Sequence, residues 1–143
     1  MPDEFVIELQ EKMNPADAGV IVKGLTEYNA LQADGDMPSH LVLAVRDQAG
    51  KVVGGLFGAT YLGWLQVQAV WLSDALRGRG YGTELMRLAE QEAVRRNCPR
   101  VFLETLSFQA LPFYEKLGYT IHSRLEGFPP GGTRYALTKH LAT

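Results

Sequence analysis

The chain has 143 residues, of which 46% are apolar and 21% are charged, and its formal net charge is −2. This length suits one domain with a single core, so we expect residues 1–143 to form one domain. Because the chain carries no excess of positive charge to attract phosphodiesters, nucleic-acid binding is disfavoured. No apolar run approaches the roughly 20 residues that a membrane helix needs, so no membrane partner is expected.

The single cysteine and the start of the chain bear on the cellular compartment. Cys98 is the only cysteine, so no internal disulfide can form, which is typical of a reducing compartment. Residues 1–10 lack the basic and apolar regions of a secretory signal peptide. We therefore expect a cytoplasmic protein. The three dispersed histidines and the lone cysteine form no zinc-binding pattern, so no metal is expected.

The N-terminal part of the sequence predicts a strand, a helix and a loop. Residues 5–9 are an apolar stretch suited to a strand. A helical pattern begins at Pro15, with Asn14 as its N-cap and apolar residues recurring on one face. From residue 28 to residue 39 the periodicity is lost and the segment becomes acidic, which predicts a loop. Such a loop could line a substrate entrance.

Three β-rich runs follow, over residues 41–45, 51–61 and 64–72. The first two flank Asp47-Gln48-Ala49-Gly50, which has the composition of a hairpin turn. The three runs together predict an antiparallel meander.

A glycine turn, Arg77-Gly78-Arg79-Gly80-Tyr81-Gly82, follows the third run, and an amphipathic helix pattern opens at its end. Glycines let the backbone approach a ligand closely, and the first turn of a helix offers unpaired N–H groups. The two arginines add positive charge. The turn therefore predicts a site for a phosphate or pyrophosphate. The simpler interpretation is that the glycines only permit a tight turn.

The remaining sequence predicts a strand, a short helix and a hairpin. The strand covers residues 100–105, and the helix covers residues 109–117 and ends at Gly118. The hairpin strands are predicted over residues 119–125 and 133–139. The strand that enters the glycine turn and the strand that follows its helix form one strand-helix-strand unit, so they should be parallel neighbours.

The motif Arg77-x-x-Gly80-x-Gly82, after a strand, is followed further along by Phe113-Tyr114-Glu115-Lys116-Leu117-Gly118-Tyr119. In this order and context, the two motifs resemble the GNAT superfamily of acyl-CoA-dependent N-acetyltransferases. The resemblance covers most of the chain. It implies a mixed α/β single domain with a central, mostly antiparallel twisted sheet and flanking helices. One parallel strand pair is expected to splay apart at the cofactor site.

The resemblance implies acetyl-CoA as co-substrate, with its pyrophosphate held by backbone N–H groups of the glycine turn. Ser107 stands where the family often has an asparagine that contacts the pantetheine arm. The cofactor-binding residues expected on this basis are Trp71, Leu72, Arg77, Gly78, Arg79, Gly80, Tyr81, Gly82, Thr83, Ser107 and Tyr114.

The resemblance also implies catalytic roles for three residues. The backbone N–H of Leu72 is expected to bond the thioester carbonyl, and the Tyr114 phenol to protonate the departing thiolate. Glu104 is the expected general base, acting directly or through water. His40 and His122 are alternative bases without a spacing argument in their favour. The simpler interpretations are that Tyr114 is a packed aromatic and that Glu104 bonds to neighbouring groups.

The expected reaction is direct transfer of an acetyl group to a primary amine of a small molecule. Alternative hypotheses are acetylation of a protein N-terminus or lysine, a non-catalytic acyl-CoA sensor, and a dinucleotide site with Glu104 on the ribose. Against the dinucleotide site, the glycine spacing is not Gly-x-Gly-x-x-Gly. The question of monomer or homodimer is left open.

Two groups of residues suggest features of the acceptor pocket. Acidic residues would favour a cationic amine, and these are Glu27, Asp34, Asp36 and Asp47. Four aromatic residues, Tyr28, Tyr61, Trp64 and Phe128, would add an aromatic wall. The alternative for Tyr61 and Trp64 is that they fill the core or a dimer interface.

Overall fold

The computed structural model describes residues 4–142, and the chain divides into two units between Met37 and Pro38. The first unit contains helix α1 (Pro15–Gln32), which confirms the predicted helix. The Asn14 side-chain oxygen caps it by accepting the N–H groups of Ala16 at 2.9 Å and Asp17 at 3.3 Å. The expectation of a single domain stays a prediction.

Two expectations for the first unit are wrong. Residues 5–9 form no strand. A strand is held by backbone hydrogen bonds to a neighbouring strand, and an apolar composition does not by itself supply that neighbour. Residues 28–32 are helical rather than loop, because the good helix formers Ala30, Leu31 and Gln32 carry α1 one turn further.

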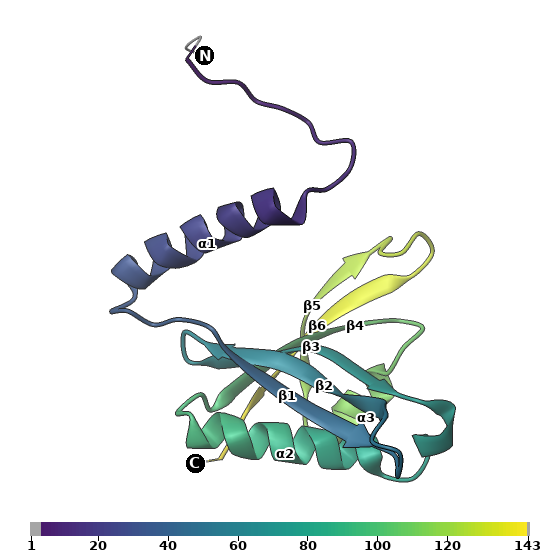
Figure 1. Ribbon diagram of the computed structural model, residues 1–143. Helices are drawn as coiled ribbons and strands as arrows, with labels where there is room; N and C mark the ends of the chain where they lie inside the picture. The colour runs from purple at the N-terminus through teal and green to yellow at the C-terminus, as the bar shows by residue number, and fades with distance from the viewer. Residues whose placement is uncertain (1–3, 143) are drawn as a thin grey trace. The chain divides into compact units, whose positions relative to one another are not determined.

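The second unit is built on a six-stranded sheet in the order β1-β2-β3-β4-β6-β5 (Figure 1). All neighbouring pairs are antiparallel except β3 and β4, which are parallel. This arrangement confirms the mixed α/β fold, the meander, the strand-helix-strand unit and the final hairpin. The strands are β1 (Ser39–Arg46), β2 (Val52–Tyr61), β3 (Trp64–Leu72), β4 (Arg100–Leu106), β5 (Thr120–Glu126) and β6 (Thr133–His140).

Helix α2 (Tyr81–Arg95) packs across β1, β2 and β3 on one face of the sheet (Figure 1). Its buried residues meet inward-facing strand residues in a single core, which includes Met86, Leu65, Val101 and Leu137. A short 3₁₀ helix η1 (Asp74–Leu76) precedes α2, and helix α3 (Leu111–Lys116) follows β4. The core is therefore built mainly by one helix on one face of the sheet.

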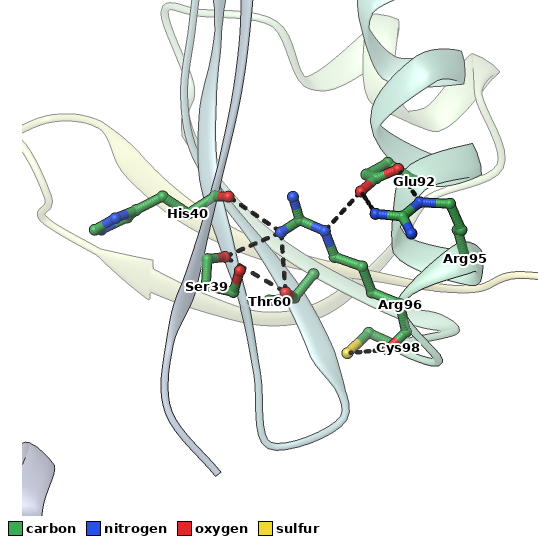
Figure 2. Close-up of polar contacts among 7 residues, drawn as sticks. All are labelled: Ser39, His40, Thr60, Glu92, Arg95, Arg96 and Cys98. Atoms are coloured by element: carbon green, nitrogen blue, oxygen red, sulfur yellow. Dashed lines mark hydrogen bonds and ion pairs between the residues drawn. The ribbon is translucent and has the colours of Figure 1, made fainter.

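The C-terminal end of α2 is tied to β1 and β2 by one arginine (Figure 2). The Arg96 guanidinium donates to the backbone oxygens of Ser39 and His40, both at 3.1 Å, and to Oγ1 of Thr60 at 3.2 Å. Its Nε also donates to the Glu92 carboxylate at 2.8 Å. These bonds give buried and half-buried polar groups their partners and fix the helix against the strands.

The parallel pair β3–β4 separates partway along its length. Hydrogen-bonded pairing covers only residues 64–67 of β3 and 100–103 of β4, although both strands continue for several residues. A bulge against β2 lies at this point, where Gln68 has no partner between Val67 and Ala69. Because a bulge bends its strand, β3 leaves the plane that would keep it paired with β4. The expected splaying is confirmed.

Candidate active site in the cleft between β3 and β4

The diverging ends of β3 and β4 enclose a cavity of about 640 Å³. Residues from both strands, from α3 and from the glycine turn line it. The predicted site residues among them are Trp71, Leu72, Arg77, Gly82, Glu104 and Tyr114. The fold thus brings together residues from four separate stretches of the chain.

The backbone of β3 presents free N–H groups to this cleft. The N–H of Ser73 donates to the Val53 oxygen of β2 at 2.9 Å. Because N–H groups alternate between the two sides of a strand, those of Leu72 and Val70 point the other way, toward β4. The pairing with β4 has already ended at that level. The Leu72 N–H is therefore available to a guest in the cleft, beside the Trp71 indole, which is 56% exposed.

The glycine turn has the conformation that only glycine adopts readily. Gly78 and Gly80 have φ angles of 71° and 86°, in the left-handed region. Gly80 is the N-cap of α2, and its carbonyl accepts the N–H of Glu84 at 3.1 Å. The N–H groups of residues 81–83 precede this first helical bond, so the helix itself leaves them without a partner. Unpaired N–H groups at the positive end of a helix dipole have the geometry that suits an anion.

Gly82 serves packing. A Cβ atom at this position would lie 3.2 Å from Cζ of Phe113 and 3.7 Å from Cδ1 of Leu72. The missing side chain therefore lets the start of α2 approach α3 and the end of β3. The sequence motif contained this glycine, but the reason for it is visible only in the tertiary structure.

The two arginines of the turn differ in their partners. Arg77 lines the cleft, and its Nη1 lies 3.1 Å from the Asp74 carboxylate in an exposed ion pair. Arg79 donates to the Ala75 carbonyl at 3.2 Å, and its guanidinium lies 5.7 Å from the centre of the Tyr81 ring. Arg79 thus stabilises the turn, while Arg77 places positive charge beside the cleft.

Tyr114 lies on α3 and reaches the cleft from the core. The residue is only 8% exposed, and its ring packs edge-on against Phe113 at 5.1 Å and Tyr119 at 5.9 Å between centroids. Burial raises the pKa of the Tyr114 phenol above its usual value. The phenol therefore keeps its proton at neutral pH and is available as a donor.

Glu104 lies on β4 and lines the same cleft. Its carboxylate accepts two hydrogen bonds from the Arg134 guanidinium of β6, at 2.8 and 3.1 Å. The hydrogen bond from Arg134 lowers the pKa of Glu104, and the positive charge of that arginine adds to the effect. The carboxylate is therefore ionised at neutral pH and fixed in place.

Ser107, which follows β4, is hydrogen-bonded to Thr133 and does not line the cleft. Its hydroxyl accepts the N–H of Thr133 at 3.1 Å, and its own N–H donates to the Thr133 carbonyl at 2.8 Å. Gln109 lines the cleft instead, with its side-chain oxygen accepting the N–H of Leu106 at 2.8 Å. The sequence analysis missed Gln109, although an amide side chain directly before Ala110 was a usable signal.

Neither a metal-binding group of side chains nor a membrane-spanning helix is found among the residues that the structure describes. Within residues 4–142, no group of three or more His, Cys, Asp or Glu side chains is placed to hold a metal ion. Over the same range, no helix combines the length and the apolar character that crossing a membrane requires.

A family model described as "Acetyltransferase (GNAT) family" matches residues 6–119. The chain belongs to the GNAT acetyltransferase family. It is therefore an acyltransferase, and the cleft between β3 and β4 is its candidate active site. This assignment sets aside the dinucleotide hypothesis.

Individual acetyltransferases agree with the family model. The chain is 35% identical to acetyltransferase Atu2258 of Agrobacterium fabrum over 67% of this chain and 70% of that protein. It is 36% identical to the blasticidin-S acetyltransferase of Streptomyces morookaense over 66% of this chain and 70% of that one. A crystal structure from Agrobacterium tumefaciens, assigned as an acetyltransferase, superposes with a TM-score of 0.88 at 30% identity and covers 96% of this chain and 100% of that one.

Proposed function

We propose that this protein transfers the acetyl group of acetyl-CoA directly to a primary amine of a small molecule. One observation carries the proposal: free backbone N–H groups of β3, the Tyr114 phenol and the glycine turn all converge on one cleft. The Streptomyces morookaense relative, which is a blasticidin-S acetyltransferase, supports a small-molecule acceptor. The sole cysteine, which excludes an internal disulfide, supports a cytoplasmic location.

The cleft fits acetyl-CoA as a co-substrate. The N–H groups of residues 79–83 would bond the pyrophosphate, with Arg77 adding charge from the side. The pantetheine arm would extend between the splayed strands, where its amides can pair with the unpaired edge of β3 and with Gln109. Trp71 and Phe108 would cover the arm's apolar portions.

The proposed reaction forms a C–N bond and breaks the thioester C–S bond. The neutral amine attacks the thioester carbonyl carbon, and the Leu72 N–H stabilises the negative charge that grows on the carbonyl oxygen. Loss of one such donor costs about 3 kcal/mol of transition-state stabilisation in well-studied cases. As the tetrahedral intermediate collapses, the electron pair of the C–S bond goes to sulfur. Sulfur then takes the phenolic proton of Tyr114.

The amine must also lose a proton, and we propose that Glu104 receives it through a water molecule. Its low pKa makes it a weak base in direct transfer, but a fixed carboxylate can orient and polarise a water. Arg134 then has a positioning role, since its two hydrogen bonds set the direction of the carboxylate. The phenolate left on Tyr114 regains a proton from solvent.

The test combines acetyl-CoA binding by calorimetry with thiol release in the presence of an amine panel. Tyr114→Phe should lower kcat by about 10²–10³-fold, because general acid catalysis contributes that much, while the acetyl-CoA Kd changes little. Glu104→Gln should lower kcat mainly at the lower end of the pH range, where the amine is most protonated. If both variants keep full turnover, the acid and base assignments are wrong. If acetyl-CoA does not bind, the proposed function itself is wrong.

A further inference from the structure

A second cavity, of about 450 Å³, lies on the other face of the sheet. Leu65 and Val67 of β3 face the core beneath α2, so the alternating residues Trp64 and Gln66 face the opposite side. Both line this cavity, together with Tyr61 of β2 and Phe102 of β4. The cavity therefore spans the middle strands on the face that α2 does not cover.

Gln68 connects the two cavities, because it lines both. It is the extra residue of the β2–β3 bulge. The sheet has a second bulge in β5, where His122 has no partner between Ile121 and Ser123, and His122 also lines the second cavity. Bulges redirect side chains and concentrate beside active sites. Both redirected side chains line the second cavity, and Gln68 also lines the cleft between β3 and β4.

The chemistry of the lining restricts what can bind. Aromatic rings form much of the wall, through Tyr61, Trp64 and Phe102. Besides the aromatic residues, the polar side chains of the lining are two glutamines, a threonine and a histidine, and within the described part of the second unit no Asp, Glu, Lys or Arg lines the cavity. A flat ring would stack against these aromatics, and the amides could bond a polar edge. A polycation would lose its hydration without gaining a carboxylate partner.

We propose that this cavity holds the body of the acceptor, which is a flat, uncharged ring system that carries the primary amine. The amine reaches the thioester past Gln68. This inference rests on the proposed function and narrows it to amines that carry an aryl or heteroaryl ring. Of the acidic residues considered for the acceptor pocket, Asp47 closes the β1–β2 turn by accepting the N–H groups of Ala49 and Lys51, and it does not line this cavity.

The two tryptophans of the chain allow each cavity to be probed separately, since Trp64 lines the second cavity and Trp71 the cleft. In Trp71→Phe protein, Trp64 is the only tryptophan that fluoresces. Adding phenethylamine should change that fluorescence in a saturable way. In Trp64→Phe protein only Trp71 emits, and coenzyme A should change it, whereas phenethylamine alone should not. An unchanged Trp64 signal at saturating amine would overturn the inference.

Turnover supplies the second readout, with phenethylamine, hexylamine and spermidine as acceptors. The ring-bearing amine should have a kcat/KM about tenfold above the other two. Trp64→Ala should weaken the apparent affinity for phenethylamine, measured as its Michaelis constant, about tenfold and leave the acetyl-CoA Kd unchanged. Phe57→Ala is the matched control, because Phe57 is a 42% exposed aromatic of β2 that does not line the cavity. It should leave both constants unchanged.

The outcomes separate the two proposals. Acetyl-CoA binding with equal turnover of all three amines would overturn the ring-binding cavity and leave the acetyltransferase function standing. Preference for spermidine would do the same and would restore a cationic acceptor. Loss of acetyl-CoA binding in the unmodified protein would overturn the proposed function and this inference together.

Discussion

The hydroxyl oxygen of Tyr61 is buried and has no hydrogen-bond partner. Among the described residues, every other buried side-chain nitrogen or oxygen has such a partner. Such groups are uncommon because each one costs about 1–3 kcal/mol of desolvation. We expect Tyr61→Phe to leave the free energy of unfolding unchanged or to raise it. Urea denaturation measures this, and a loss above about 1 kcal/mol would mean that the hydroxyl has a stabilising partner.

Gly82 is the residue on which the approach of α2 to α3 depends. In Gly82→Ala the Phe113 ring must shift by a few tenths of an ångström to admit the new methyl, and where a packed ring cannot shift freely such overpacking costs about 1 kcal/mol or more. Both stability and acetyl-CoA affinity should fall, because the displaced ring lines the cleft. Adding Phe113→Leu should restore part of the stability. If Gly82→Ala is as stable as the unmodified protein, the close approach is not under steric constraint.

At the scale of the elements, the glycine turn fixes the start of α2, and the hydrogen bonds of Arg96 hold its end against β1 and β2. The carboxylate of Glu92 receives hydrogen bonds from Arg95 and Arg96, and these lower its pKa from 4.5 to about 2. Arg95 bonds only within the helix, whereas Arg96 continues to β1 and β2. The two arginines are therefore a matched pair, and Arg96→Gln should lower the free energy of unfolding, measured by urea denaturation, more than Arg95→Gln.

The lowered pKa of Glu92 predicts that the free energy of unfolding depends on pH. A carboxyl whose pKa is depressed by folding stabilises the fold above its unfolded pKa, near 4.5, and that stabilisation is lost as the pH falls toward 2. The stability difference between the unmodified protein and Glu92→Gln should therefore be largest at neutral pH and shrink below pH 4.5. Urea denaturation at a series of pH values measures it. A difference that is constant with pH would contradict the ion-pair explanation.

At the scale of the whole molecule, the single-domain prediction has a direct test. If residues 1–143 fold as one domain, thermal unfolding followed by circular dichroism and by tryptophan fluorescence should give coincident transitions. Both tryptophans lie in the second unit, so a helical signal lost at a different temperature would reveal an independently melting α1. Acetyl-CoA at 100 times its Kd should stabilise the unit that binds it by about 2.7 kcal/mol.

Sequence reasoning went furthest where the signal is local. Asn14 before Pro15 predicted the helix start, and the β-rich runs with the turn Asp47-Gln48-Ala49-Gly50 predicted the meander, because capping and turn composition depend on near neighbours. The glycine turn was likewise predicted from adjacent residues, and the structure shows positive φ angles at Gly78 and Gly80. The strand expected over residues 5–9 failed for the opposite reason, because a strand requires a partner that its own sequence cannot specify.

The amino-acid sequence by itself determined the family, the order of the elements from α1 onward and several residues that line the candidate cleft, since motifs and periodicity are local features of the chain. Only the tertiary structure decided what those residues touch. In the folded chain Glu104 pairs with Arg134, Ser107 is hydrogen-bonded to Thr133, and Gln68 lines two cavities. The physical reason is that strand register, bulges and packing join residues far apart in sequence. Their contacts depend on the whole sheet and on no single segment.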